Sequence, residues 1–203
     1  LDFEEILRID PNNINAINEI GITYEEQGKI EESIWFYTIG IEKRNLNPTT
    51  ASYCYSNRGR LLLDQNRFDE ALSDFTLAIE FSENKASAYR TRAEYFQSRG
   101  EFDRALIDFS LAIENASDDK SLYYYFRAVF YKDYLKNELN AFEDYQKILE
   151  IDSTDFDALI GVCGFRISQG EFRQSLEILD KWQTSNEIND SIRTIFCLFK
   201  GSL

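Results

Sequence analysis

The sequence lacks histidine altogether and has only three cysteines and two prolines among its 203 residues. Histidine is the commonest general base and a common zinc ligand, so its absence argues against acid–base catalysis and metal binding. Cys54, Cys163 and Cys197 are far apart and form no CxxC pair, which argues against zinc sites and a disulfide framework. We therefore expect no catalytic residue, cofactor or metal, and the unpaired thiols suit a reducing, cytoplasmic setting.

Positive charge is also scarce, because 22 Lys and Arg stand against 36 Asp and Glu, for a net charge of -14. Such an acidic surface repels phosphate backbones and anionic membranes, so nucleic acid is a poor partner. Nowhere do 18 apolar residues run together, and we expect no membrane insertion. The absence of GxxxxGK[ST] and GxGxxG motifs argues against a phosphate-binding loop.

The sequence does contain two interlocked series of small residues inside helical patterns. The first series, with spacings of 38, 34, 35, 35 and 34, is Gly21, Gly59, Ala93, Ala128, Cys163 and Cys197. The second, 12 or 13 residues behind it, is Ser33, Ala71, Ala105, Ala141 and Ser175. Turn residues such as Gln27-Gly28-Lys29 and Gln65-Asn66-Arg67 lie between the two series. The period predicts stacked antiparallel helix pairs that share a continuous core.

This pattern resembles the tetratricopeptide repeat, in which small and aromatic residues of a first helix precede Ala and an aromatic in the second. The aromatic or Leu of the second helix is present as Tyr37, Phe75, Phe109, Tyr145 and Leu179. The resemblance covers nearly the whole chain and implies an all-α fold, a right-handed α-solenoid of antiparallel helix pairs. We place one domain over 1–203, divided into the end of a preceding repeat (1–13), repeats 1 to 5 (14–51, 52–85, 86–120, 121–155 and 156–189) and a capping helix (190–203).

The first spacing, from Gly21 to Gly59, is four residues longer than the usual period of 34. Four residues are about one helical turn. We expect the extra turn at the end of the second helix of repeat 1, near Lys43–Pro48.

The N-terminal residues Phe3, Ile6, Leu7 and Ile9 belong to a predicted helix whose partner helix is missing. The chain also has no initiator Met. We expect either that it is a fragment of a longer protein or that it self-associates through its N-terminal face.

Arginine and aspartate occur together at fixed positions of the two helices in repeats 2, 3 and 4. These combinations, 16 or 17 residues apart, are Arg58 with Asp74, Arg92 with Asp108, and Arg127 with Asp144. Repeats 1 and 5 have Ile20 with Phe36 and Val162 with Ile178 instead. The arginines could form a basic recognition stripe, but their co-occurrence with aspartate favours structural ion pairs, which are worthwhile only when both partners are present.

In this family the first helix of each pair lines a concave face where peptides commonly lie. The resemblance therefore implies a peptide-binding groove that includes Asn18, Tyr53, Asn57, Arg60, Arg90, Tyr125 and Phe126. Asparagine can bind a peptide backbone and arginine a carboxylate, so we expect an acidic side chain or C-terminus in the ligand. Alternatively, Arg90 pairs with Glu94 one turn on and Arg60 is solvated. The convex face and the loops stay open as other binding surfaces.

Taken together, the resemblance implies a protein- or peptide-binding scaffold or adaptor and not an enzyme. The alternative is a regulatory or targeting domain of a larger enzyme whose catalytic part lies outside this chain. Flanking sequence would distinguish the two. We expect Cys163 and Cys197, which occupy the small-residue position between helices, to be inert core thiols, and Cys54 likewise, because free cysteine is among the most buried residue types.

Overall fold

A computed structural model describes residues 3–185, and within that range all regular structure is α-helical. Contacts between the helices divide the chain into two compact units, residues 1–116 and 117–203. The predicted capping helix at 190–203 and Cys197 lie outside the described residues.

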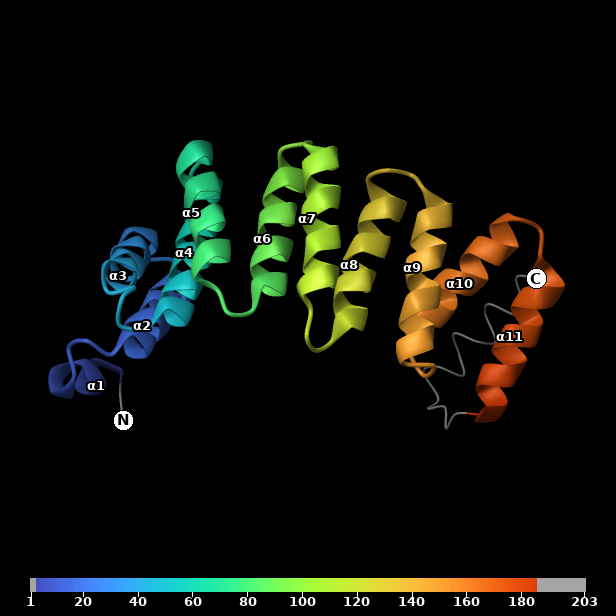
Figure 1. The fold of residues 1–203 in the computed structure, drawn as a ribbon, viewed down its shortest axis with the longest axis horizontal. Coiled ribbons are helices and arrows are strands. Elements are labelled where there is room, and N and C mark those ends of the chain that lie inside the picture. Colours follow the sequence, from blue (N-terminus) through green and yellow to red (C-terminus); the bar gives the residue numbers. More distant parts are fainter. Residues whose placement is uncertain (1–2, 186–203) are drawn as a thin grey trace. The chain divides into compact units, whose positions relative to one another are not determined.

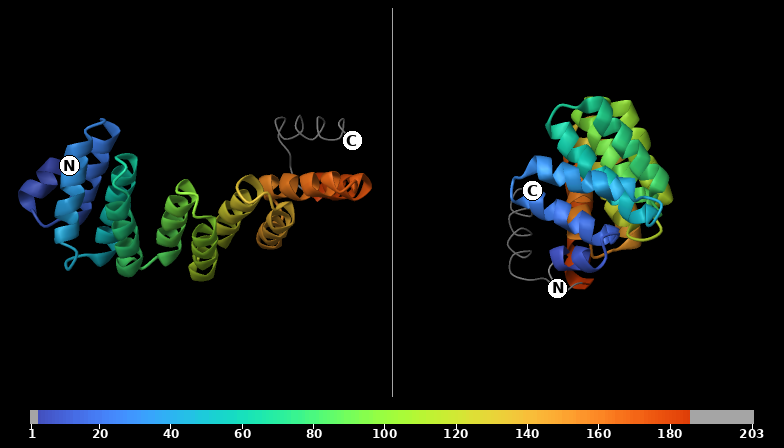
Figure 2. Two further views of the ribbon diagram at one scale, coloured as in Figure 1. Left: turned by 90° about the horizontal axis from the view of Figure 1, so that it is seen from above. Right: turned by 90° about the vertical axis from the view of Figure 1, so that its left-hand side faces the viewer.

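The described part of the first unit consists of a short helix followed by three helix pairs. Its elements are α1 (Phe3–Ile9), α2 (Ile14–Glu26), α3 (Ile30–Glu42), α4 (Pro48–Asp64), α5 (Phe68–Phe81), α6 (Lys85–Ser98) and α7 (Phe102–Asn115). Helices α4 and α5 form one antiparallel pair and α6 and α7 another (Figures 1 and 2). The first helices α2, α4 and α6 also contact one another in sequence, so neighbouring pairs stack.

The described part of the second unit contains two helix pairs. They are α8 (Lys120–Asp133) with α9 (Glu138–Ile151), and α10 (Phe156–Ser168) with α11 (Phe172–Ser185). Helix α9 packs on α10 and joins the two pairs (Figure 1). The division between the units falls in the loop that precedes α8, close to the predicted boundary between repeats 3 and 4.

Four of the turns within the pairs share one backbone geometry. A residue with positive φ closes the first helix in each of them, at Gly28 (72°), Asn66 (61°), Gly100 (71°) and Gly170 (78°). In each turn the next amide donates to a carbonyl five residues earlier, at 2.8–2.9 Å, as in a Schellman motif. In the α8–α9 turn Lys136 has φ 53°, and the amide of Asn137 reaches six residues back to Tyr131. This turn therefore contains the one-residue insertion of repeat 4.

The extra turn predicted at the end of repeat 1 lies elsewhere, so that prediction was wrong. Helix α3 has 13 residues, whereas α4 has 17 and begins at Pro48. The Asn47 side chain accepts a hydrogen bond from the Thr50 amide at 3.0 Å, and proline at the first helical position needs no amide partner. The added turn also packs on α2, where Thr50 Oγ1 donates to Asn15 Oδ1 at 2.5 Å.

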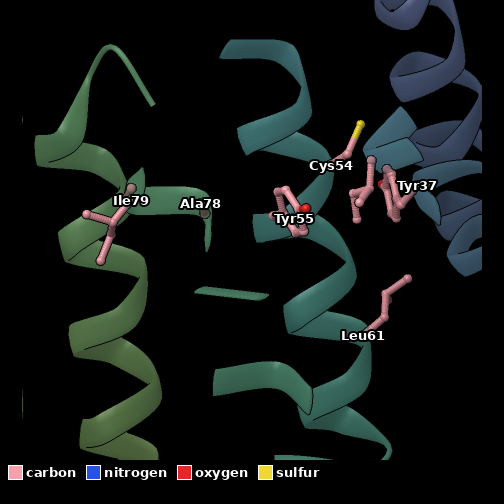
Figure 3. Close-up of a cluster of buried hydrophobic side chains, with 8 residues drawn as sticks. Tyr37, Cys54, Tyr55, Leu61, Ala78 and Ile79 are labelled. Carbon is pink, nitrogen blue, oxygen red and sulfur yellow. The ribbon is translucent and has the colours of Figure 1, made fainter. Parts of the chain in front are cut away.

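The core of the first unit is built from large side chains that meet small ones across each pair. A Cβ at Gly21 would lie 2.5 Å from the Tyr37 ring, and one at Gly59 would lie 2.8 Å from the Phe75 ring. The two small-residue series also touch, since Ser33 Oγ donates to the Gly21 carbonyl at 2.8 Å. Figure 3 shows a cluster contributed by α3, α4 and α5: Tyr37, Cys54, Tyr55, Leu61, Ala78 and Ile79.

The second unit has two clusters of the same kind. One joins α8, α9 and α10 and is centred on Tyr145, Ile148 and Val162. The other joins α10 and α11 and contains Leu159, Cys163, Leu179 and Trp182. Helix α10 contributes to both clusters, so it connects the two pairs.

Candidate functional site

The three arginine–aspartate combinations are bidentate ion pairs, each within one helix pair. Arg58 donates to Asp74 through Nε and Nη2, both at 2.8 Å. Arg92 does the same to Asp108 at 2.7 and 2.9 Å, and Arg127 to Asp144 at 2.9 and 2.7 Å. The aspartates are buried, so these arginines form part of the structure and not an exposed recognition stripe.

Arg58 and Arg92 also reach the second helix of the preceding pair. Arg58 Nη1 donates to Thr38 Oγ1 at 3.0 Å, and Arg92 Nη1 donates to Thr76 Oγ1 at 3.4 Å. Burial disfavours the charge of Arg58, but the hydrogen bond and the negative charge of Asp74 together outweigh this and raise the pKa of Arg58. The threonines lie five residues after Ser33 and Ala71, so the period marks their positions, although these contacts were not predicted.

The asparagines of the predicted groove lie between α2 and α4. Asn18 is only 7% exposed, and its Oδ1 accepts from Asn57 Nδ2 at 3.3 Å and from Cys54 Sγ at 3.6 Å. Asn57 Oδ1 in turn accepts from Arg60 Nη2 at 3.1 Å. Asn18 therefore holds the two helices together, whereas Asn57 and Arg60 reach the surface.

Both groove arginines of the first unit are paired with carboxylates. Arg90 contacts Glu94, which is the alternative considered for it from the sequence. Arg60 lies 3.5 Å from Glu25 while its side chain stays 52% exposed. Glu25 also accepts from the Tyr37 hydroxyl at 3.0 Å. The Arg60–Glu25 pair was not predicted, because the two residues are 35 positions apart and no repeated pattern connects them.

A hollow of about 320 Å³ opens beside this network in the first unit. Among the groups that line it are Arg60, Glu25, Asp64 and Glu94. Burial raises the pKa of the Glu94 carboxyl, against the effect of nearby Arg90. Three carboxylates around one guanidinium make this hollow a poor place for an acidic ligand.

The predicted aromatic groove residues are accessible to different degrees. Tyr53, on α4, is 48% exposed, and Tyr125, on α8, is 37% exposed. Phe126 is half-buried and lies edge-on to Tyr125, with ring centres 6.4 Å apart. Tyr53 belongs to the first unit, whereas Tyr125 and Phe126 belong to the second. The three residues are therefore not assigned to one common surface.

Cys54 and Cys163 are both buried among the described residues. Burial raises the pKa of the Cys54 thiol to about 12 and also raises that of Cys163. No group of three or more Cys, Asp or Glu side chains between residues 3 and 185 is placed to hold a metal ion. No helix in this range has both the length and the apolar character that crossing a bilayer requires.

Comparison with known proteins identifies the repeat. Residues 52–86, which comprise most of α4 and all of α5, match the tetratricopeptide repeat family. The solved structure of YrrB, described as a tetratricopeptide-repeat protein with an unusual peptide-binding site, is similar over 100% of this chain and 99% of that one, with 16% identity and a TM-score of 0.58. Residues 52–86 therefore match this repeat, and the chain has the fold of tetratricopeptide-repeat proteins.

Other relatives agree on the tetratricopeptide-repeat fold. Yeast Tom70 has a TM-score of 0.71 and 17% identity, covering 98% of this chain and 42% of that one. At such low identity the likeness shows the fold alone, and it confirms the predicted all-α helix-pair solenoid. RNA polymerase II-associated protein 3 of Rattus norvegicus is 33% identical over 89 residues, which are 44% of this chain and 13% of that protein. The chain thus spans a small part of the length of that relative.

Proposed function

We propose that this tetratricopeptide-repeat chain is a protein-binding scaffold or adaptor and not an enzyme. A segment of the partner lies along the surface of α2, α4 and α6. The observation that carries the proposal is a set of accessible groups on α4, where Tyr53 and Arg60 are exposed and each lies about one turn from the partly exposed Asn57. A rigid aromatic face beside amide and guanidinium donors suits an extended polypeptide.

The proposed ligand differs from the acidic one predicted from the sequence. That prediction treated Arg60 and Arg90 as available for a carboxylate, but Glu25 and Glu94 already contact them. A polar, uncharged segment fits better, since its backbone carbonyls can accept from Asn57 and Arg60 without repulsion from the nearby glutamates. Its side chains would pack on Tyr53.

The test uses a double variant, Tyr53→Ala with Arg60→Ala, in the full chain. Both side chains are exposed, so the variant should fold normally. Partners are captured from the source cell with the wild-type chain, identified by mass spectrometry and titrated against both proteins. We expect the Kd of the recovered partner to rise about tenfold or more, since a lost charged hydrogen bond alone costs about 1–3 kcal/mol.

The matched control is Trp35→Ala, which removes an exposed aromatic from the second helix α3. We expect this variant to bind like the wild type. Unchanged affinity of the Tyr53/Arg60 variant, together with loss in the Trp35 variant, would move the binding surface to the second helices.

A further inference from the structure

Helices α8, α9 and α10 of the second unit surround a cavity of about 470 Å³. Four aromatic rings line it, those of Tyr125, Phe142, Tyr145 and Phe165. Phe142 and Phe165 stack with ring centres 4.5 Å apart, and Tyr125 meets Tyr145 edge-on at 6.4 Å. The volume lies within the range of roughly 300–1,000 Å³ that is typical of ligand pockets.

Two glycines of α10 shape this cavity in different ways. A Cβ at Gly161 would overlap the ring of Tyr145, so this glycine lets the ring form one wall. A Cβ at Gly164 would meet no atom within 4 Å, so this glycine leaves the space beside it empty. Each glycine in a helix interior costs up to about 1 kcal/mol relative to alanine. At Gly164 no neighbouring atom would clash with an added Cβ, so packing does not explain why a glycine stands there.

The open position is particular to the fifth repeat. Gly164 directly follows the small residue Cys163, and the equivalent positions of the other repeats all carry side chains: Ile22, Arg60, Glu94 and Val129. In the hollow of the first unit this position is occupied by the Glu94 carboxylate. In the fifth repeat Gly164 leaves the corresponding space open, so this cavity can accept a side chain from outside.

The charges at the edge of the cavity are mainly negative. Asp157 and Glu138 line it, and among the described residues no Lys or Arg lies within 4 Å of either carboxylate. Glu138 accepts from the Ser168 hydroxyl at 3.2 Å. Lys132 also lines the cavity. Burial raises the pKa of Tyr145 to about 12, and Tyr125, Asp133 and Asp157 reinforce this effect. With a net charge of -14 on the whole chain, this edge attracts a cation.

We propose that the cavity holds an aromatic side chain of a partner protein, with a Lys or Arg next to it that pairs with Asp157 or Glu138. Aromatic rings favour edge-to-face and offset contacts with other rings, and all four walls offer them. Enclosed aromatic anchors flanked by polar contacts carry much of the binding energy at protein interfaces. The inference rests on the proposed binding function and specifies the partner chemistry at a second surface.

The experiment titrates the full chain, labelled with ¹⁵N-glycine, with a capped hexapeptide of sequence Gly-Ser-Trp-Lys-Ser-Gly. We expect saturable shifts of the Gly161 and Gly164 amide signals, while those of Gly21 and Gly59 in the first unit stay in place. Two matched control peptides carry one change each: Ser in place of Trp in the first, and Glu in place of Lys in the second. Each should bind at least about tenfold more weakly, because each lacks one of the two contacts.

The decisive variant is Gly164→Leu, which fills the cavity without meeting a neighbouring atom at Cβ. We expect its melting temperature to equal or exceed that of the wild type, because leucine favours helix more than glycine does. Its Kd for the Trp-Lys peptide, followed by the Gly161 signal, should rise about tenfold or more. The Tyr53→Ala/Arg60→Ala variant should bind this peptide like the wild type, which separates failure at this cavity from failure at the first surface.

Three results would overturn the proposal. The first is equal binding by Gly164→Leu, and the second is equal binding of the Glu peptide. The third is no response of the full chain to any peptide.

Discussion

Asp108 illustrates how a single charged residue is accommodated in the interior of this protein. Its side chain is only 2% exposed, and an isolated carboxylate at such a place would be strongly disfavoured. Two hydrogen bonds from Arg92, at 2.7 and 2.9 Å, satisfy both of its oxygens. The pair is therefore a unit whose two members depend on each other, and its net contribution is smaller than the loss on removing either one.

We predict that Asp108→Ala lowers the free energy of unfolding by about 3–5 kcal/mol, because it leaves Arg92 with an unpaired charge. The double variant Arg92→Val/Asp108→Ile copies repeat 5, where Val162 faces Ile178, and should lose much less. Urea denaturation of the wild type and both variants measures the difference. A double variant as unstable as the single one would contradict this interpretation.

The ion pairs could be predicted from the sequence because both members recur with the period. Repeats 2, 3 and 4 repeat the same combination, and repeats 1 and 5 replace both members together. The contact between Arg60 and Glu25 has no counterpart in the other repeats, so periodicity gave no signal for it. Asn18 was placed in the groove for its position alone, whereas packing against Cys54 and Asn57 buries it. Repetition thus reveals the structural contacts more readily than the individual ones that form a binding surface.

Helix α10 offers a comparison between two glycines three residues apart. We predict that Gly164→Ala raises the free energy of unfolding by up to about 1 kcal/mol, because alanine favours helix and the added methyl meets nothing. Gly161→Ala should lower it by about 1–3 kcal/mol, because its methyl overlaps the Tyr145 ring. Thermal unfolding of the two variants decides the matter. A gain for Gly161→Ala as well would mean that the Tyr145 ring moves aside freely, and a loss for Gly164→Ala would mean that the added methyl is not accommodated.

The start of α4 gives a second test at the level of one helix. Asn47 caps this helix through its side chain, whereas Asn84, which precedes α6, makes no side-chain cap. We predict a loss of about 0.5–2 kcal/mol for Asn47→Ala and almost none for Asn84→Ala. Chemical denaturation of the two variants provides the comparison. An equal loss for both would show that the Asn47 hydrogen bond does not stabilise the added turn.

The position of the added turn shows the limit of reading elements from spacing. The distance from Gly21 to Gly59 indicated that four residues are added, and one helix is indeed longer. Spacing alone could not assign them to α3 or α4. The local signal was Asn47-Pro48, an N-cap followed by proline at the first helical position. Lys136 presents a similar case, because no glycine or asparagine marked it as the residue of positive φ.

At the scale of the whole chain, each helix contacts mainly its neighbours in the sequence. In repeat proteins of this kind stability is the sum of local terms and nearest-neighbour interfaces, so different parts can open separately. The core is accordingly divided into several clusters, of which one joins α3 to α6 and another joins α10 to α11. A substitution in one cluster should therefore destabilise mainly the helices that form that cluster.

Leu159→Ala tests this expectation, because Leu159 is buried in the cluster of Cys163, Leu179 and Trp182. The substitution should cost about 2–5 kcal/mol. We predict that amide hydrogen exchange accelerates in α10 and α11 and stays unchanged in α4 and α5. Phe75→Ala, in the core of the first unit, should produce the reverse pattern. If either substitution accelerated exchange equally in all helices, the chain would unfold as a single cooperative body, and a ligand bound at one surface would stabilise every repeat.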